Sequence, residues 1–263
     1  MSTRLPASPD TEHFAAPLCR NCDVPLHGPW CAQCGQKRAQ RLGARSLGAE
    51  VWQSWRWFEL ALAKGALSLV RGPGTVAREY VLGARSRHVH PLKLLLAAIA
   101  ILLLVLAEAR YLDSANEHVS RAMAMVRDYG KWSFSLGIVA IALASNVAFF
   151  RHGGFNRTEH LVLAAYTHFL VICASIVNLL PTLLIRSPEF LRAHKAAASW
   201  YMGAVDVVIV LVAFAQFFRI DWRRDAWRLL LAAVVFLLAK WALLRLYAWL
   251  LLKYVLQQLA APT

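Results

Sequence analysis

Two closely spaced cysteine pairs near the N-terminus have the residue type and spacing of a metal site. Cys19 and Cys22 form the first CxxC pair and Cys31 and Cys34 the second, with eight residues between the pairs. Together they supply the four thiolates that a closed tetrahedral zinc site requires. The spacing predicts one structural Zn²⁺ in a minimal zinc ribbon over residues 18–38, and four protein ligands leave no open position for a catalytic water.

Disulfide bonds are the competing interpretation of these cysteines. Two disulfides need an oxidising compartment, whereas the Lys and Arg residues just before the first apolar run predict that this part of the chain stays in the cytoplasm, so zinc is favoured. The fifth cysteine, Cys173, lies alone in an apolar run and is expected to be a small buried side chain. His27, in the spacer between the pairs, could replace a ligand, but an exposed position is favoured.

The rest of the chain is too apolar for a soluble domain. Hydrophobic residues make up 59% of the 263 and charged residues 17%, which fits a helical protein that crosses a membrane several times. The fold class expected is mainly α, a multi-pass bundle over residues 91–259 preceded by the ribbon and an amphipathic helix. Five spans are predicted, at about 92–109, 132–150, 161–185, 200–218 and 229–252, with exterior loops at 108–131 and 186–199. A four-span alternative has the last helix lying flat or re-entrant.

Four polar residues lie inside these predicted spans and are candidates for contacts within the membrane. Counted from the span ends, Asp206 and Lys240 fall at similar depths, and an unpaired charge is costly in lipid. We therefore predict that they form an ion pair, with a proton or ion relay as the alternative. Asn146 and His168 are predicted to meet near the inner leaflet; the alternatives are that His168 bonds a backbone carbonyl or that Asn146 pairs within its own helix.

The segment before the first span divides into three parts. Residues 1–17 are expected to be a disordered lead. Residues 39–90 should form a basic linker, an amphipathic helix and a glycine–proline break at Arg71-Gly-Pro-Gly74. The apolar stripe of that helix runs from Leu47 to Leu69 and suits either a membrane surface or the ends of the spans, and its tryptophans suit the headgroup boundary: Trp52, Trp55 and Trp57.

These residues together resemble a family of uncharacterised bacterial membrane proteins, domain of unknown function 3667. The resemblance consists of a CxxC…CxxCGQ ribbon followed by a membrane junction motif, R-x-P-G-x-x-x-R-E-Y-x-x-G-x-R and then H-P-L-K at the start of a span. It covers about the first 110 residues and implies architecture and no known activity. Besides the four cysteines, the matching positions are Gly35, Gln36, Pro73, Gly74, Arg78, Glu79, Tyr80, Gly83, Arg85, His90 and Pro91.

Charge predicts the orientation and the partners. The net charge of +14 is concentrated before the first span and in short loops, which favours anionic lipids of the inner leaflet over nucleic acid. No nucleic-acid-binding motif accompanies it. We expect a bacterial inner-membrane protein with a cytoplasmic N-terminus.

The sequence gives less information about function than about fold. It contains no serine elbow, phosphate-binding loop, HExxH pair or paired carboxylate site, so no enzyme activity is predicted. The favoured interpretation is an adaptor, assembly or sensor protein whose ribbon engages a cytoplasmic protein partner. The alternative is a transporter or channel for a small solute or ion that uses the polar residues within the membrane.

Overall fold

The computed structural model describes residues 8–44, 46–47, 60–108, 135–150 and 152–260, and these are mainly α-helical. The ribbon region has a short helix, α1 (Thr11–Ala15), and two isolated β-bridges; no longer strand occurs in the described residues. α3 (Leu60–Arg71), α4 (Pro73–Val81) and the 3-10 turn η1 (Arg85–Arg87) lead to the bundle. The bundle consists of α5 (Pro91–Glu108), α7 (Leu136–Ala148), α8 (Arg157–Leu184), α9 (Pro188–Phe218) and α10 (Ala226–Ala260), with the 3-10 turn η4 (His152–Gly154) before α8.

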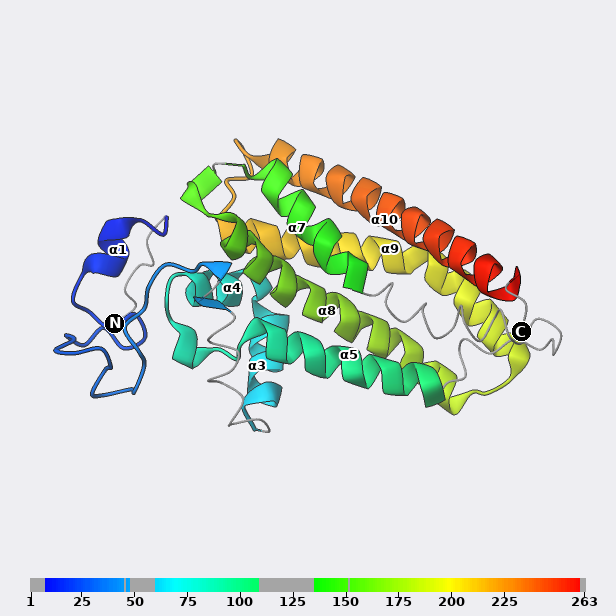
Figure 1. The fold of residues 1–263 in the computed structure, drawn as a ribbon, viewed down its shortest axis with the longest axis horizontal. Helices are drawn as coiled ribbons and strands as arrows, with labels where there is room; N and C mark the ends of the chain where they lie inside the picture. Colours follow the sequence, from blue (N-terminus) through cyan, green and yellow to red (C-terminus); the bar gives the residue numbers. More distant parts are fainter. Residues whose placement is uncertain (1–7, 45, 48–59, 109–134, 151, 261–263) are drawn as a thin grey trace.

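Helix length and composition confirm the predicted fold class. Four helical segments of the described chain are long and apolar enough to cross a membrane: 85–108, 157–184, 188–218 and 226–257. α7 is also apolar but has 13 residues, and the start of the span predicted at 132–150 lies outside the described residues. α8 packs against α5, α7 and α9, while α10 runs along α7 and α9 as one continuous helix (Figure 1).

Local capping explains where two long helices begin. Asn156 and Glu159 form a capping box at the start of α8, each side chain bonding the other residue's backbone N–H. Ser187 caps α9, and Pro188 occupies its first turn, where the missing N–H costs nothing. The prediction of a loop at 186–199 is therefore wrong, because Glu189, Arg192 and Lys195 lie on helix α9.

The glycine–proline break is confirmed as the boundary between two helices. α3 ends at Arg71, Gly72 has a non-helical backbone, and Pro73 begins α4. Gly83, with φ of +109°, follows the end of α4, in the left-handed region that glycine adopts without strain. The tryptophans predicted for the headgroup boundary lie outside the described residues: Trp52, Trp55 and Trp57.

The described part of the N-terminal lead, residues 8–17, is more ordered than predicted. Asp10 caps α1 by accepting a hydrogen bond from the backbone N–H of His13. His13 in turn contacts the carbonyl of Leu82, just after α4, with 2.8 Å between its Nε2 and the oxygen. Residues 11–15 are thus helical and tied to the ribbon side of the bundle.

Candidate metal centre and its contacts with the membrane helices

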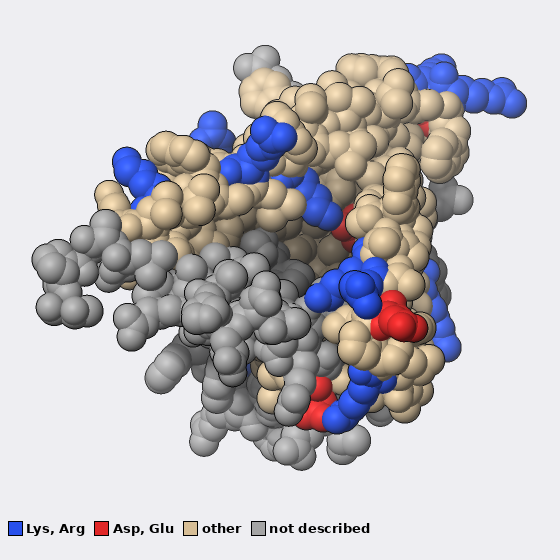
Figure 2. Space-filling view, turned by 90° about the vertical axis from the view of Figure 1, so that its right-hand side faces the viewer, with Lys and Arg blue, Asp and Glu red and all other residues tan. Residues whose placement is uncertain are grey.

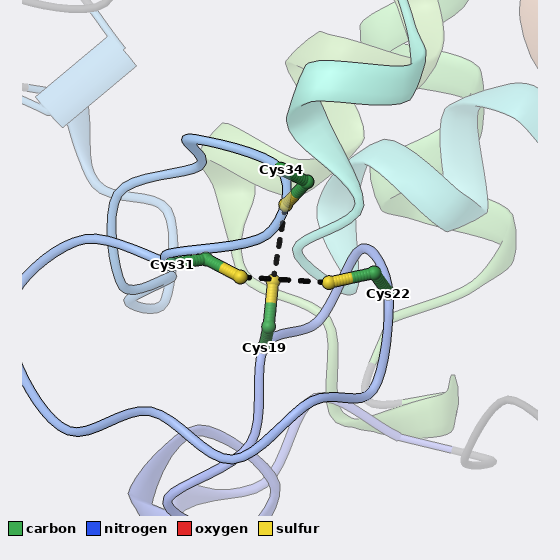
Figure 3. A group of neighbouring side chains, drawn as sticks. All are labelled: Cys19, Cys22, Cys31 and Cys34. Atoms are coloured by element: carbon green, nitrogen blue, oxygen red, sulfur yellow. Dashed lines mark hydrogen bonds between the residues drawn. The ribbon is translucent and has the colours of Figure 1, made fainter.

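The four cysteines of the two CxxC pairs converge on one point. Their sulfur atoms all lie within 4.8 Å of one another, and the Sγ atoms of Cys19 and Cys34, and of Cys22 and Cys31, are each 3.5 Å apart. Figure 3 shows the four side chains pointing inward from two loops. A Zn–S bond of about 2.3 Å gives sulfur–sulfur distances of roughly 3.8 Å in a tetrahedron. The sulfurs are therefore spaced for a tetrahedral metal ion and too far apart for disulfides, whose S–S bond is about 2.05 Å.

The two loops are copies of one backbone arrangement, displaced by twelve residues. In the first, the N–H of Asp23 bonds the carbonyl of Cys19; in the second, the N–H of Gly35 bonds the carbonyl of Cys31, both at 2.9 Å. Asp23 and Gly35 have φ of +59° and +69°. Each loop is closed by an antiparallel bridge, Leu18 with Pro25 and Trp30 with Lys37. The chain thus forms two equivalent cysteine-bearing turns that face each other.

Backbone hydrogen bonds favour the thiolate form of Cys31, whereas burial raises the pKa of the Cys19 thiol. The backbone N–H of Cys34 lowers the pKa of the Cys31 thiol, because a donated hydrogen bond stabilises the negative sulfur. Cys19 and Cys31 are buried, so solvent has little access to the cluster. The residues present fit a structural Zn²⁺, and when bound it would link the two turns. His27 is exposed and lies outside the cluster.

Changing Cys22 to serine should remove most of the bound metal. A hydroxyl is a poor replacement for one of four thiolates, and a structural zinc site loses its folding energy with its ligands. Metal analysis of purified protein should give about one zinc per chain for the wild type and far less for Cys22→Ser. Cys173→Ser is the matched control, because Cys173 packs in the bundle. A stable disulfide among the four cysteines in intact cells would contradict the site.

Gln36 attaches the ribbon to the turn after α4. Its amide donates to the carbonyl of Gly83 at 2.8 Å, and its Oε1 accepts from both the backbone N–H and the hydroxyl of Ser86 at 2.9 Å each. Gln36 is 8% exposed. A Cβ on Gly83 would lie 2.9 Å from the Cβ of Ala39 and 3.0 Å from that of Arg20. The CGQ end of the ribbon and the glycine of the junction motif therefore form one packed contact.

Further hydrogen bonds surround this contact. Arg85 donates to the carbonyl of Gln40, and Arg87 donates to that of Asn21 at 3.0 Å. The linker that follows the ribbon is fixed as well, since the guanidinium of Arg41 bonds both carboxylate oxygens of Glu159 at 3.0 and 3.2 Å. The Glu159 side chain is fully buried. Two parallel hydrogen bonds between a guanidinium and a carboxylate fix the relative orientation of the two side chains.

Changing Gln36 to leucine should release the ribbon from the bundle. The polar groups of Gly83 and Ser86 would lose their partner while remaining close to an apolar side chain, at a cost of about 1–3 kcal/mol. Trypsin should then cut the basic linker after Lys37 to Arg41 about 5 to 150 times faster, since cleavage follows the population of the open form. Gln33→Leu is the matched control, because Gln33 is exposed. Equal cleavage rates for the two variants would contradict the contact.

The first half of the junction motif packs α4 against the end of α9. Gly74 has no side chain between itself and α9: a Cβ there would lie 2.0 Å from the carbonyl oxygen of Ala213. Its N–H donates to the side chain of Gln216 at 3.0 Å. One turn later, Arg78 donates to the carbonyl of Phe217 and lies over the ring of Phe155. Burial lowers the pKa of Arg78 to about 10, helped by the nearby charge of Arg219.

The second half of the motif fixes the start of α5. Glu79 bonds the ring of His88 at 2.7 Å, which lowers the pKa of the Glu79 carboxyl. This contact stabilises the fold at neutral pH and is lost as the pH falls through that lowered pKa. Tyr80 is buried edge-to-face against His90 and Tyr166, and Pro91 begins α5.

Asp206 and Lys240 meet, as their predicted depths suggested. The Lys240 ammonium lies 2.5 Å from Oδ2 of Asp206. Asp206 lies twelve residues before the end of α9 at Phe218, and Lys240 fourteen residues after the start of α10 at Ala226. Helices joined by a short connection are antiparallel neighbours, so nearly equal counts from that connection put the two charges side by side.

Asn146 and His168 are not brought together, and for Asn146 the structure has the alternative that was expected, a bond within its own helix. Asn146 donates to the carbonyl of Ala142 in its own helix at 2.8 Å. The ring of His168 lies against Gly137, where a Cβ would be 2.4 Å from it. Gly137 is nine residues from Asn146, or roughly 13 Å along α7. The expected contact fails because α8 begins at Arg157, four residues before the predicted span, and α7 ends at Ala148, two residues before its predicted end.

A buried pair that the sequence analysis missed follows from the same counting. Ser145 lies three residues before the end of α7 at Ala148, and His160 three residues after the start of α8 at Arg157. The Ser145 hydroxyl and Nδ1 of His160 are 2.6 Å apart, and both side chains are buried. Correct helix ends would have identified this contact.

The comparisons with known proteins add one family match. Residues 62–103 match the model of a family described as "Protein of unknown function (DUF3667)". The match covers α3, α4 and most of α5, the region of the junction motif, and it confirms the resemblance found in the sequence. The cysteine cluster lies outside the matched residues and is consistent with that resemblance. No curated protein and no solved structure matches the chain.

Proposed function

We propose, taking the family signature over residues 62–103 as the premise, that this chain is an adaptor or assembly protein of the bacterial inner membrane. In this proposal the ribbon binds one structural zinc ion, faces the cytoplasm and presents a fixed surface to a protein partner. The observation that carries it is the contact of Gln36 with Gly83 and Ser86. A ribbon on a flexible linker would not need this contact. A binding surface that is held in one position loses less conformational entropy when it binds a partner and therefore binds more tightly.

Charge supports the cytoplasmic orientation. The linker after the ribbon bonds the end of the bundle where α7 is joined to α8, through Arg41 to Gly154 and Glu159. At the same end, α4 bonds the last turn of α9 through Arg78 to Phe217, and Gln36 attaches the ribbon to the turn after α4. The α9–α10 connection at that end is rich in arginine, and short basic connections are retained on the cytoplasmic side. Its basic residues are Arg219, Arg223 and Arg224, and Arg228 follows in the first turn of α10.

The exposed part of the ribbon supports a protein partner. Trp30 is 56% exposed, and the ammonium of Lys37 lies 6.0 Å from its ring. Leu18, at the equivalent position of the first turn, is 37% exposed. A tryptophan beside cations is a frequent anchor of protein interfaces. With Arg20 and Arg38 nearby in the sequence, the partner we expect offers an acidic segment with an apolar side chain.

Photo-crosslinking in living cells tests this proposal. A crosslinking residue in place of Trp30 should give a discrete protein adduct, and the Cys22→Ser change should abolish it by unfolding the ribbon. The same residue in place of Trp222 is the control, since Trp222 is exposed in the α9–α10 connection at the same end of the bundle. If position 30 gives only lipid adducts, or the same adducts as position 222, the adaptor proposal is wrong.

A second candidate function is passage of a small solute or ion. It is favoured by one observation, a cavity beside Asp206 and Lys240 among the membrane helices. Purified protein in liposomes should then conduct protons or ions, and Asp206→Asn with Lys240→Met should stop the flux. Tight liposomes with folded protein would exclude this candidate and leave the adaptor proposal unaffected.

A further inference from the structure

The cavity among α7, α8, α9 and α10 has mostly apolar walls. Its volume is about 420 Å³, within the range of small-ligand sites. On α8 its lining extends from His168 to Leu179, roughly 16 Å along the helix axis. Apolar side chains such as Leu136, Ile141 and Phe236 form much of the remaining wall. In Figure 2 the molecule is seen from the end where α8 turns into α9, and this end is hollowed between the helices, with basic and acidic side chains at the hollow.

Asp206, which also lines the cavity, has an unfilled position for a hydrogen-bond donor. The residue is 4% exposed, and only its Oδ2 is bonded, by Lys240. Its Oδ1 is buried and has no hydrogen-bond partner among the described residues. A buried carboxylate oxygen without a donor is costly. A ligand that donates a hydrogen bond to Oδ1 removes this cost.

The ammonium group beside this oxygen determines which donor fits. Lys240 lines the cavity and keeps 34% of its side chain exposed, and an ammonium has three donors, so some remain besides the one bonded to Oδ2. A hydroxyl group both donates and accepts, so a single hydroxyl can donate to Oδ1 of Asp206 and accept from Lys240. A ligand ammonium has no acceptor and adds a like charge beside Lys240, and an ionised carboxylate has no donor for Oδ1.

The depth of the ion pair favours a neutral ligand as well. Asp206 lies twelve residues before the end of α9 at Phe218, or roughly 18 Å along the helix. The arginine-rich connection after α9 stays outside the hydrocarbon, so in a core of ~30 Å Asp206 lies near the middle of the bilayer. A net charge is costly at this depth, whereas a neutral molecule with a hydrocarbon body dissolves there readily.

We propose that this cavity binds a small, neutral, lipophilic alcohol or phenol. Its hydroxyl donates to Oδ1 of Asp206 and accepts from the ammonium of Lys240, and its hydrocarbon part lies along the apolar walls. The ion pair is thus a recognition group for a hydroxyl inside the membrane. This proposal is independent of the proposed function of the ribbon, and it requires no passage of the ligand across the membrane.

Photolabelling of the intact protein in detergent tests the proposal, with a decanol that carries a diazirine as the probe. Adducts are expected in peptides that contain Ser175 or Met202, which line the cavity on α8 and α9. Four competitors share one chain and differ in the polar group: decanol, decyl methyl ether, decylammonium and decanoate. At equal concentration in the detergent phase, decanol should compete at least about tenfold better than the ether, which lacks the donor, because tenfold corresponds to one good hydrogen bond.

The other outcomes contradict the proposal. Equal competition by the ether would mean that the cavity takes any hydrocarbon and does not recognise a hydroxyl. Stronger competition by decylammonium or decanoate would mean that the site selects a charge. Adducts that avoid both cavity peptides would mean that the probe binds elsewhere.

Two variants separate recognition from folding. Asp206→Leu with Lys240→Met removes both hydroxyl partners and should make decanol and the ether compete equally; this ratio does not depend on the folded yield. Ser175→Leu fills the cavity from α8 without changing the ion pair, and should lower labelling of the cavity peptides. Arg245→Met is the matched control, since Arg245 lies on α10, stacks on Trp241 and does not line the cavity. Wild-type labelling in Ser175→Leu, an equal loss in Arg245→Met, or a decanol preference that survives the double change would overturn the proposal.

Discussion

Adding a single methyl group at Gly74 is expected to prevent normal packing of the membrane bundle. A Cβ there would lie 2.0 Å from the carbonyl oxygen of Ala213 and 2.5 Å from the backbone nitrogen of Phe217. These are backbone atoms of α9, which cannot rotate away as a side chain can. Gly74→Ala must therefore push α4 off α9, and we expect it to lower the free energy of unfolding by about 3 kcal/mol or more.

The measurement is denaturation of the two glycine variants in the same detergent. Gly203→Ala is the matched control, because a Cβ at Gly203 has no atom within 4 Å and the residue lies within helix α9. That change should be neutral or stabilising by about 0.5–1 kcal/mol, as alanine has the higher helix propensity. If Gly74→Ala unfolds at the same denaturant concentration as the wild type, α4 does not pack on α9 as described.

The second large effect is expected when one charge of the pair within the membrane is removed. Asp206 is 4% exposed and Lys240 bonds it directly. Asp206→Asn leaves a lysine without its carboxylate, and Lys240→Met leaves a buried carboxylate alone. Each change should cost about 3–5 kcal/mol, mostly because the remaining charge is unpaired. The double change leaves no charge behind and should recover a large part of that loss.

A double-mutant cycle measures this recovery. The four proteins are compared by folded yield from the membrane and by denaturation in detergent. Arg245→Met, which removes a charge from α10 without breaking an ion pair recorded in the structure, should have little effect. Losses that simply add in the double variant would mean that the two side chains act independently.

Spacing in the sequence was sufficient to predict the cysteine cluster and the ion pair. Each CxxC pair brings its own two sulfurs together locally. Only one short loop then has to fold for the two pairs to meet. Asp206 and Lys240 are 34 residues apart, but the connection between their helices is short, so their depths could be counted from a common point. In both cases local geometry determines which residues meet.

Contacts that depend on exact helix ends or on distant segments were not predictable in this way. The helix ends differ from the predicted ones by four residues at the start of α8 and by two at the end of α7, and His168 therefore lies against Gly137 and not against Asn146. The exterior loop at 186–199 was inferred from its charges, although a helix can carry charges beyond the membrane. Gln36 and Gly83 belong to two motifs 47 residues apart, and neither motif specifies that the other is its partner.

Hydrogen exchange of the turn after α4, with and without metal, tests most directly whether the ribbon is fixed to the bundle. The N–H of Ser86 is bonded by the side chain of Gln36, 50 residues away in the sequence. Removing the bound metal with a chelator is expected to unfold the ribbon. Exchange should then rise in a peptide that contains Ser86 as well as in the ribbon, while the middle of α8 stays protected. Unchanged protection at Ser86 in metal-free protein would contradict the account.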